Sequence, residues 1–111
     1  MFSKGDIVIV KFPYTNLKKF KLRPALILSN NKVNKTGDYI LMQITSKFRN
    51  DDLTFELDNE VYSGNKSLPL KSYLKLKKVF TVNEDLIQKK HTELTKSAVS
   101  NILFKFNELF S

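Results

Sequence analysis

Two basic segments, residues 18–23 and 46–49, hold the residue types that best suit phosphate chemistry. Arg23 ends the first segment and is one of only two arginines among the 19 Lys and Arg residues. A guanidinium can bind a phosphate through two parallel hydrogen bonds, which a lysine ammonium cannot do. Thr45 and Ser46 add hydroxyl donors at the end of an apolar segment. If the strands that carry them pair, Arg23 and Thr45 lie near each other at one rim of a sheet and could hold a phosphate.

The two segments also have the composition of a surface for single-stranded nucleic acid. The first interleaves cations with an aromatic ring, in Lys18, Lys19, Phe20 and Lys21. Cations can follow the phosphates of such a chain while an aromatic ring stacks on a base. The corresponding candidates in the second segment are Ser46, Lys47 and Arg49. A solvated, charged loop is the alternative interpretation of both segments.

Other groups that could do chemistry are weaker candidates. Glu56, Asp58 and Glu60 alternate along an expected strand, so their carboxylates share one face and could hold a hard cation. The solvent face of an edge strand explains the same pattern, and we predict no metal site. His91 is the single histidine, and we expect it at the surface or in a turn rather than as a general base. Motifs for nucleotide or cofactor binding are absent from the sequence, and we expect no cofactor.

Composition narrows the class of protein. The 111 residues suit one domain spanning 1–111, and 41% hydrophobic residues argue against disorder. The absence of cysteine excludes disulfides, thiolate chemistry and zinc–thiolate sites. The apolar stretches are far shorter than a ~20-residue membrane span, and Asp6 interrupts any signal-peptide core. We therefore expect a cytoplasmic protein that does not contact the membrane.

The net charge of +8 lies entirely in the first half of the chain. Residues 1–50 contain ten Lys and Arg residues against Asp6 and Asp38, whereas residues 51–111 contain nine lysines and nine acids. Such a one-sided distribution suggests a polyanionic partner, either nucleic acid or an acidic protein segment. Adjustment of solubility in a lysine-rich protein is the other interpretation.

The order of short apolar segments predicts a β-rich chain. Strands are expected over residues 6–12, 25–29, 39–45, 53–58 and 74–79. Residues 14–23 read as a loop, with Pro24 starting the second strand, and residues 83–87 as one helical turn. Apolar residues recur at helical spacing after a plausible N-cap, Thr95, with Phe104 outside the apolar stripe. Closely spaced strands followed by one helix favour a small antiparallel barrel or curled sheet with a packed helix.

Several segments, in order along the chain, resemble the MazF/PemK family of toxin endoribonucleases. They are Lys4-Gly5-Asp6-Ile7-Val8, Phe12-Pro13-Tyr14-Thr15, Arg23-Pro24-Ala25-Leu26-Ile27-Leu28-Ser29, Ile44-Thr45-Ser46 and Ser72-Tyr73-Leu74-Lys75-Leu76-Lys77, followed by the helix from Thr95. The resemblance implies a small SH3-like barrel with a C-terminal helix, a homodimer and metal-independent cutting of single-stranded RNA. It further implies products with 2′,3′-cyclic phosphate and 5′-hydroxyl ends, and a cognate antitoxin with an extended, acidic segment. In this family the central catalytic pair corresponds to Arg23 and Thr45.

The sequence departs from the family pattern at Lys77, where several relatives carry an acid, so no role for a carboxylate is carried over there. Two alternatives stay open. The chain could be a non-catalytic module of the same barrel that binds RNA, or a protein target as gyrase-poisoning relatives of the fold do. It could also be a weakly catalytic member that acts mainly by binding its antitoxin.

Overall fold

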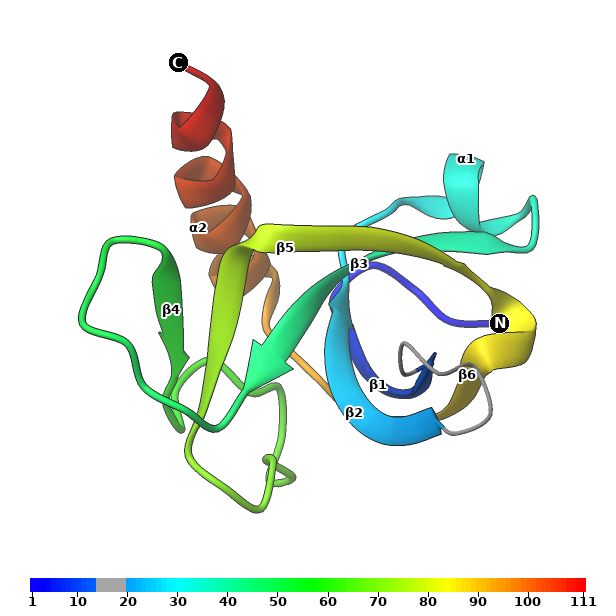
Figure 1. Ribbon diagram of the computed structural model, residues 1–111, viewed down its shortest axis with the longest axis horizontal. Helices are drawn as coiled ribbons and strands as arrows, with labels where there is room; N and C mark the ends of the chain where they lie inside the picture. Colours follow the sequence, from blue (N-terminus) through cyan, green and yellow to red (C-terminus); the bar gives the residue numbers. More distant parts are fainter. Residues whose placement is uncertain (14–19) are drawn as a thin grey trace.

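Six strands form one antiparallel sheet in this computed structural model, which describes residues 1–13 and 20–111 (Figure 1). The strands are β1 (Asp6–Pro13), β2 (Phe20–Ile27), β3 (Asp38–Thr45), β4 (Thr54–Leu57), β5 (Ser72–Asn83) and β6 (Ile87–Glu93). Their order in the sheet is β4-β5-β3-β2-β1-β6. Figure 1 shows the sheet curling around an interior, with the C-terminal helix packed beside it. The prediction of a mainly β, antiparallel fold with a C-terminal helix is confirmed.

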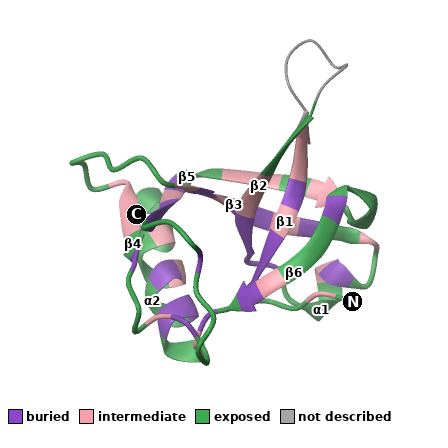
Figure 2. Ribbon diagram, turned by 90° about the horizontal axis from the view of Figure 1, so that it is seen from below, coloured by how far each residue is buried: buried purple, intermediate pink, exposed green. Residues whose placement is uncertain are grey.

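Both faces of the central strands are buried, which explains their continuous apolar sequences. Alternate residues of β1 belong to two different hydrophobic clusters. Ile7 packs in one cluster with Leu26 and Met42, and Val8 belongs to the other. Successive side chains of a strand point to opposite faces, so these clusters lie on the two sides of the sheet. Figure 2 shows the buried residues concentrated in β1, β2, β3 and the inner side of the helix. A strand buried on both faces needs apolar residues at consecutive positions.

The helices are α1 (Asn31–Asn34), α2 (Lys96–Asn107) and the short 3-10 turns η1 (Glu84–Leu86) and η2 (Glu108–Phe110). Thr95 caps α2 as predicted, because its side chain accepts a hydrogen bond from the Ala98 N–H at 3.1 Å. Ile102 is fully buried against the sheet, whereas Phe104 is 68% exposed. None of the helices in the described part of the chain is long and apolar enough to cross a membrane.

Several predicted boundaries were wrong, among them those of β5, which runs from Ser72 to Asn83 instead of over residues 74–79. β2 begins at Phe20, so the last part of the expected loop is strand, and Pro24 lies inside it opposite Ile9 of β1. The pairing of β2 with β3 starts only at Ala25, and proline is tolerated where one side of a strand is unpaired. The segment Ile87–Glu93 was not predicted as a strand, although η1 before it matches the expected helical turn. The expected turn at residues 30–37 contains α1.

Candidate active site

A basic cleft of about 970 Å³ lies where β2, β3, β5 and β6 meet the connections that follow β3 and β4. Six cations line it: Lys21, Arg23, Lys47, Arg49, Lys75 and Lys89. The described residues of its lining include no Asp and no Glu. Cations that share a cleft of low-dielectric walls produce a strong positive field, which attracts polyanions and opposes the entry of metal cations.

Arg23 and Thr45 both line this cleft, as expected from the pairing of their strands. Arg23 is held in β2 opposite Val10 of β1. On the other side of β2, Ala25 pairs with Gln43 of β3, and continuing that register by two residues brings Arg23 across from Thr45. The regular pairing of β2 with β3 ends at Ala25 and Gln43, and both Arg23 and Thr45 line the cleft beyond that point.

The Thr45 hydroxyl accepts one hydrogen bond at the edge of the cleft. The backbone N–H of Lys47 donates to Thr45 Oγ1 over 3.1 Å. This bond occupies the oxygen as an acceptor and leaves the hydroxyl proton for another partner. The backbone of Thr45 pairs with Tyr73 of β5, which holds the residue at the end of β3. Thr45 is half-buried and positioned through both its backbone and its side chain.

The other predicted binding residues are only partly brought together. Lys21, Ser46, Lys47 and Arg49 line the cleft. Phe20 does not belong to the lining, and its ring lies 5.3 Å from the Lys11 ammonium instead. Lys18 and Lys19 lie outside the described residues.

Lys75 joins the cleft because of an irregularity in β5. Met42 of β3 pairs with Val79 of β5, and Ile44 pairs with Leu74. Between these two pairs β3 has one residue, Gln43, whereas β5 has four, residues 75–78. Such bulges redirect side chains and are common beside functional sites. Burial lowers the pKa of Lys75, and the charges of Arg49, Lys78, Arg23 and Lys47 lower it further. The cleft therefore destabilises the protonated ammonium until an anion enters.

β6 supplies three cleft residues that the sequence analysis did not assign: Gln88, Lys89 and His91. The register between β6 and β1 shifts twice. As a result, Gln88 and His91 of β6 have no pairing partner in β1. Both therefore lie at bulges, which interrupt the alternation that would have revealed a strand. His91, which was expected at the surface or in a turn, is a half-buried residue of β6 at the cleft.

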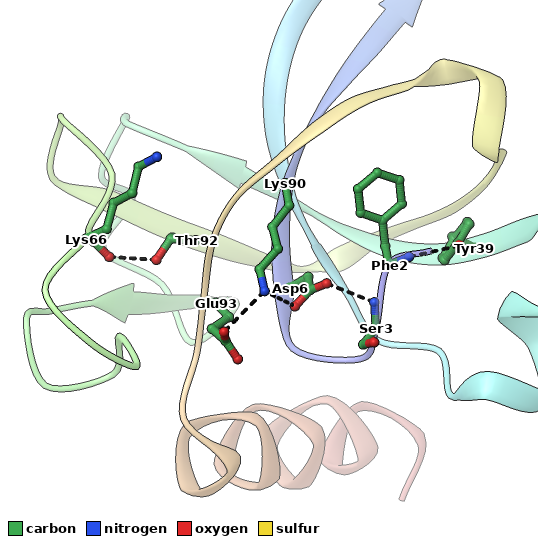
Figure 3. A network of polar contacts seen from close by, with 8 residues as sticks. All are labelled: Phe2, Ser3, Asp6, Tyr39, Lys66, Lys90, Thr92 and Glu93. Atoms are coloured by element: carbon green, nitrogen blue, oxygen red, sulfur yellow. Dashed lines mark hydrogen bonds and ion pairs between the residues drawn. The ribbon is translucent and has the colours of Figure 1, made fainter.

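One wall of the cleft comes from residues 62–71, which we call the strap. It runs from β4 to β5 and is tied to β6 by polar contacts. Thr92 Oγ1 donates to the Lys66 carbonyl at 2.6 Å (Figure 3). In addition, His91 Nε2 lies 3.1 Å from the Ser67 carbonyl. A carbonyl can only accept, so His91 carries a proton on Nε2 in this contact. These contacts place Leu68, Pro69 and Leu70 against the cleft.

β6 is itself anchored to the start of β1 by a buried carboxylate (Figure 3). The Asp6 side chain is 3.3 Å from Lys90 Nζ and also accepts a hydrogen bond from the Ser3 N–H at 2.9 Å. Lys90 Nζ lies 3.2 Å from Glu93 Oε1, and this hydrogen bond raises the pKa of Lys90. The network satisfies Asp6, which is almost fully buried, and fixes β6 beside β1.

The acidic side chains of β4 and the following turn lie apart from this cleft. Glu56 pairs with Lys71 at 3.5 Å, and Asp58 accepts a hydrogen bond from the Glu60 N–H. Within residues 1–13 and 20–111, no group of three or more carboxylate or imidazole side chains is arranged to hold a metal ion.

Comparison with known proteins identifies the family. The sequence profile of the PemK-like, MazF-like toxins of type II toxin–antitoxin systems matches residues 3–110. The chain belongs to this family. Among curated proteins, none is similar enough in sequence to count as a match.

Solved structures of MazF toxins share the fold. A mycobacterial endoribonuclease in complex with its cognate antitoxin has a TM-score of 0.76 at 19% identity, covering 99% of this chain and 95% of that one. MazF in the MazE–MazF complex of Deinococcus radiodurans has a TM-score of 0.78 at 17% identity, covering 98% and 95%. The Mycobacterium tuberculosis toxin MazF-mt6 has a TM-score of 0.72 at 18% identity, covering 95% of each chain. At these identities the likeness concerns the fold.

Proposed function

We propose that this MazF/PemK family member is a toxin endoribonuclease that cuts single-stranded RNA in the basic cleft. The observation that carries the proposal is the meeting of Arg23 and Thr45 in a cleft lined by six cations and, among its described residues, no carboxylate. Structural relatives that bear the name endoribonuclease, found both alone and with a cognate antitoxin, support the same activity.

The reaction we propose uses the RNA's own 2′-hydroxyl as the nucleophile. Its oxygen attacks the adjacent phosphorus, the bond from phosphorus to the 5′-oxygen breaks, and the products are a 2′,3′-cyclic phosphate and a 5′-hydroxyl. The 2′-hydroxyl loses its proton and the departing 5′-oxygen gains one. Negative charge accumulates on the non-bridging oxygens in the transition state, so donors placed there in advance accelerate the reaction.

Arg23 and Thr45 are the donors in this scheme. Arg23 supplies a permanent positive charge and two parallel N–H groups to the phosphate. Thr45 supplies its hydroxyl proton, which the Lys47 N–H leaves available by occupying the oxygen. Arg23 is not the group that removes the 2′-proton, because the pKa of a guanidinium lies above ~12.

We propose that cleavage needs no metal ion or cofactor, because the transition-state charge can be met by protein cations alone. Lys21, Lys47, Arg49, Lys75 and Lys89 neutralise neighbouring phosphates of the bound strand. The positive field of these groups opposes binding of a divalent cation at the same place.

The same field suits an acidic peptide. We propose that a cognate antitoxin covers the cleft with an extended, acidic segment and that the toxin acts as a homodimer in the cytoplasm. The antitoxin-bound structural relatives support this partner.

Mixed-sequence RNA incubated with purified protein in excess EDTA tests the proposal. We expect the wild type to cut the RNA and Arg23→Ala and Thr45→Ala variants not to cut it. RNA carrying 2′-O-methyl groups should be bound but stay intact, and the cut ends should be cyclic phosphates and 5′-hydroxyls. Equal binding by all three proteins without cutting would refute catalysis and favour a binding module. Intact RNA together with trapped DNA–gyrase complexes would identify a gyrase poison.

A further inference from the structure

Phe48 is an aromatic side chain that the fold keeps exposed beside the cleft. Four phenylalanines in the described part of the chain are more than half exposed: Phe20, Phe48, Phe104 and Phe110. Phe48, at 63% exposure, is the one that lies between two cations of the cleft lining, Lys47 and Arg49. Phe20 is also next in sequence to a cleft residue, Lys21, but its ring already contacts the Lys11 ammonium.

The Phe48 ring packs against a buried aromatic residue, Tyr73. Its centroid lies 5.4 Å from that of Tyr73, at an interplanar angle of 56°. Tyr73 is only 7% exposed and pairs with Thr45 across the β3–β5 ladder. One side of the Phe48 ring therefore rests on the residue that holds Thr45, while much of the ring faces solvent.

The backbone around Phe48 is held by hydrogen bonds that do not involve its side chain. Before it, the Lys47 N–H donates to Thr45 Oγ1. After it, the Arg49 carbonyl accepts from the Asp51 N–H at 2.9 Å and from the Thr54 hydroxyl at 3.2 Å. The segment 46–52 is exposed throughout, as the green connection before β4 in Figure 2 shows. These hydrogen bonds hold the backbone on either side of Phe48.

The cations continue beyond Phe48 into a second hollow of about 330 Å³. Arg49 and Lys75 line both hollows, and the second adds Lys77 and Lys78 together with one acid, Asp51. Lys77 stands where several family members carry an acid, so this chain has a cation there instead. A strand of nucleic acid leaving the cleft over Arg49 thus meets further positive charge, with Phe48 beside its path.

We propose that Phe48 is a base-stacking platform for a nucleotide that flanks the cut, with Lys47 and Arg49 binding the phosphates on either side of it. This inference rests on the proposed function and adds to it a binding subsite. Stacking on an aromatic ring is tolerant of base identity and strong, since loss of such a ring weakens binding about 5- to 150-fold.

The absence of tryptophan from the chain permits a direct optical test. In a Phe48→Trp variant the indole is the single tryptophan, and a stacked base should quench its fluorescence. The probes are a mixed-sequence 2′-O-methyl RNA dodecamer, which cannot be cut by its own 2′-hydroxyl, and an abasic oligomer of equal length and charge. We expect the dodecamer to quench the fluorescence and the abasic oligomer to bind without quenching. Phe104→Trp, at a matched exposure on α2, is the control and should respond to neither.

Affinity measurements complete the test. Phe48→Ala should bind the dodecamer about 5- to 150-fold more weakly, with an unchanged salt dependence because no phosphate contact is lost. It should bind the abasic oligomer like the wild type, and Phe48→Tyr should restore affinity for the dodecamer. If the wild type cuts RNA but Phe48→Ala binds both oligomers like the wild type, the platform is refuted while the proposed function stands. If the wild type neither binds nor cuts RNA, the platform and the proposed function are both refuted.

Discussion

Replacing Thr45 with valine is the sharpest single test of the proposed chemistry. Valine has nearly the same shape and suits a strand, so the backbone pairing of residue 45 with Tyr73 should persist. The substitution removes the hydroxyl and leaves the Lys47 N–H without its acceptor. Lys47 is exposed, so water can replace that acceptor.

The expected effects on stability and on rate are well separated. Loss of one hydrogen bond at a solvent-accessible site lowers stability by at most about 1 kcal/mol. For a domain of this size that corresponds to a fall in Tm of about 4–8 °C. Loss of one donor to a charged transition state costs about 10²–10³ in kcat. Because domains typically have about 5–15 kcal/mol of stability, the variant stays folded and the slower rate reflects chemistry.

Single-turnover cleavage of mixed-sequence RNA measures the rate, and titration with the 2′-O-methyl dodecamer measures binding. We expect Thr45→Val to lose about 10²–10³ in rate with little change in affinity, which is the pattern for an interaction made mainly in the transition state. Thr45→Ser keeps the hydroxyl and should retain most of the activity. Cleavage by folded Thr45→Val within about threefold of the wild-type rate would show that the hydroxyl does not act on the phosphate.

Three further predictions follow from the charges and the core. Because the pKa of Lys75 is lowered, RNA affinity of the wild type should begin to fall at a pH below the ordinary lysine value of ~10.4, as the ammonium that binds phosphate is lost. Lys75→Arg stays charged and should move the start of that decline to a higher pH in a titration of affinity against pH, with the remaining decline due to the other cleft lysines. Lys47→Gln should reduce the slope of log affinity against log salt by about one unit, whereas Lys32→Gln on α1 should leave it unchanged. In urea unfolding, Ile102→Ala should cost about 2–5 kcal/mol, because its side chain is fully buried, and Phe104→Ala less than about 0.5 kcal/mol.

Two of the candidate residues line the same cleft because their strands are neighbours in the sheet. Thr45 ends β3 and Arg23 lies inside β2, and antiparallel pairing of these neighbouring strands brings both residues to the cleft lining. The basic segments beside them added Lys21, Ser46, Lys47 and Arg49 correctly to the cleft lining. Phe20 is not among the described residues of that lining, and its ring lies 5.3 Å from the Lys11 ammonium.

Three of the missed cleft residues come from irregularly paired parts of strands. Lys75 lies in the shifted part of β5, and Gln88 and His91 are the residues that β1 skips in β6. A bulge inserts residues without a partner, so it removes the alternation from which a strand and its faces are predicted. The polar sequence of β6 therefore resembled a loop, although three of its side chains line the cleft.

The sequence by itself determined the β-rich class, the capped C-terminal helix and the positive charge of the first half, because these depend on local periodicity and composition. The tertiary structure alone decided which cations share one cleft. Lysines from the electrically neutral second half, Lys75 and Lys89, join those of the basic first half there, while the acids Glu56 and Asp58 lie elsewhere. Charge at a site depends on which side chains the sheet's curl and bulges bring within reach of one another, and that geometry is set by pairing between strands far apart in the chain.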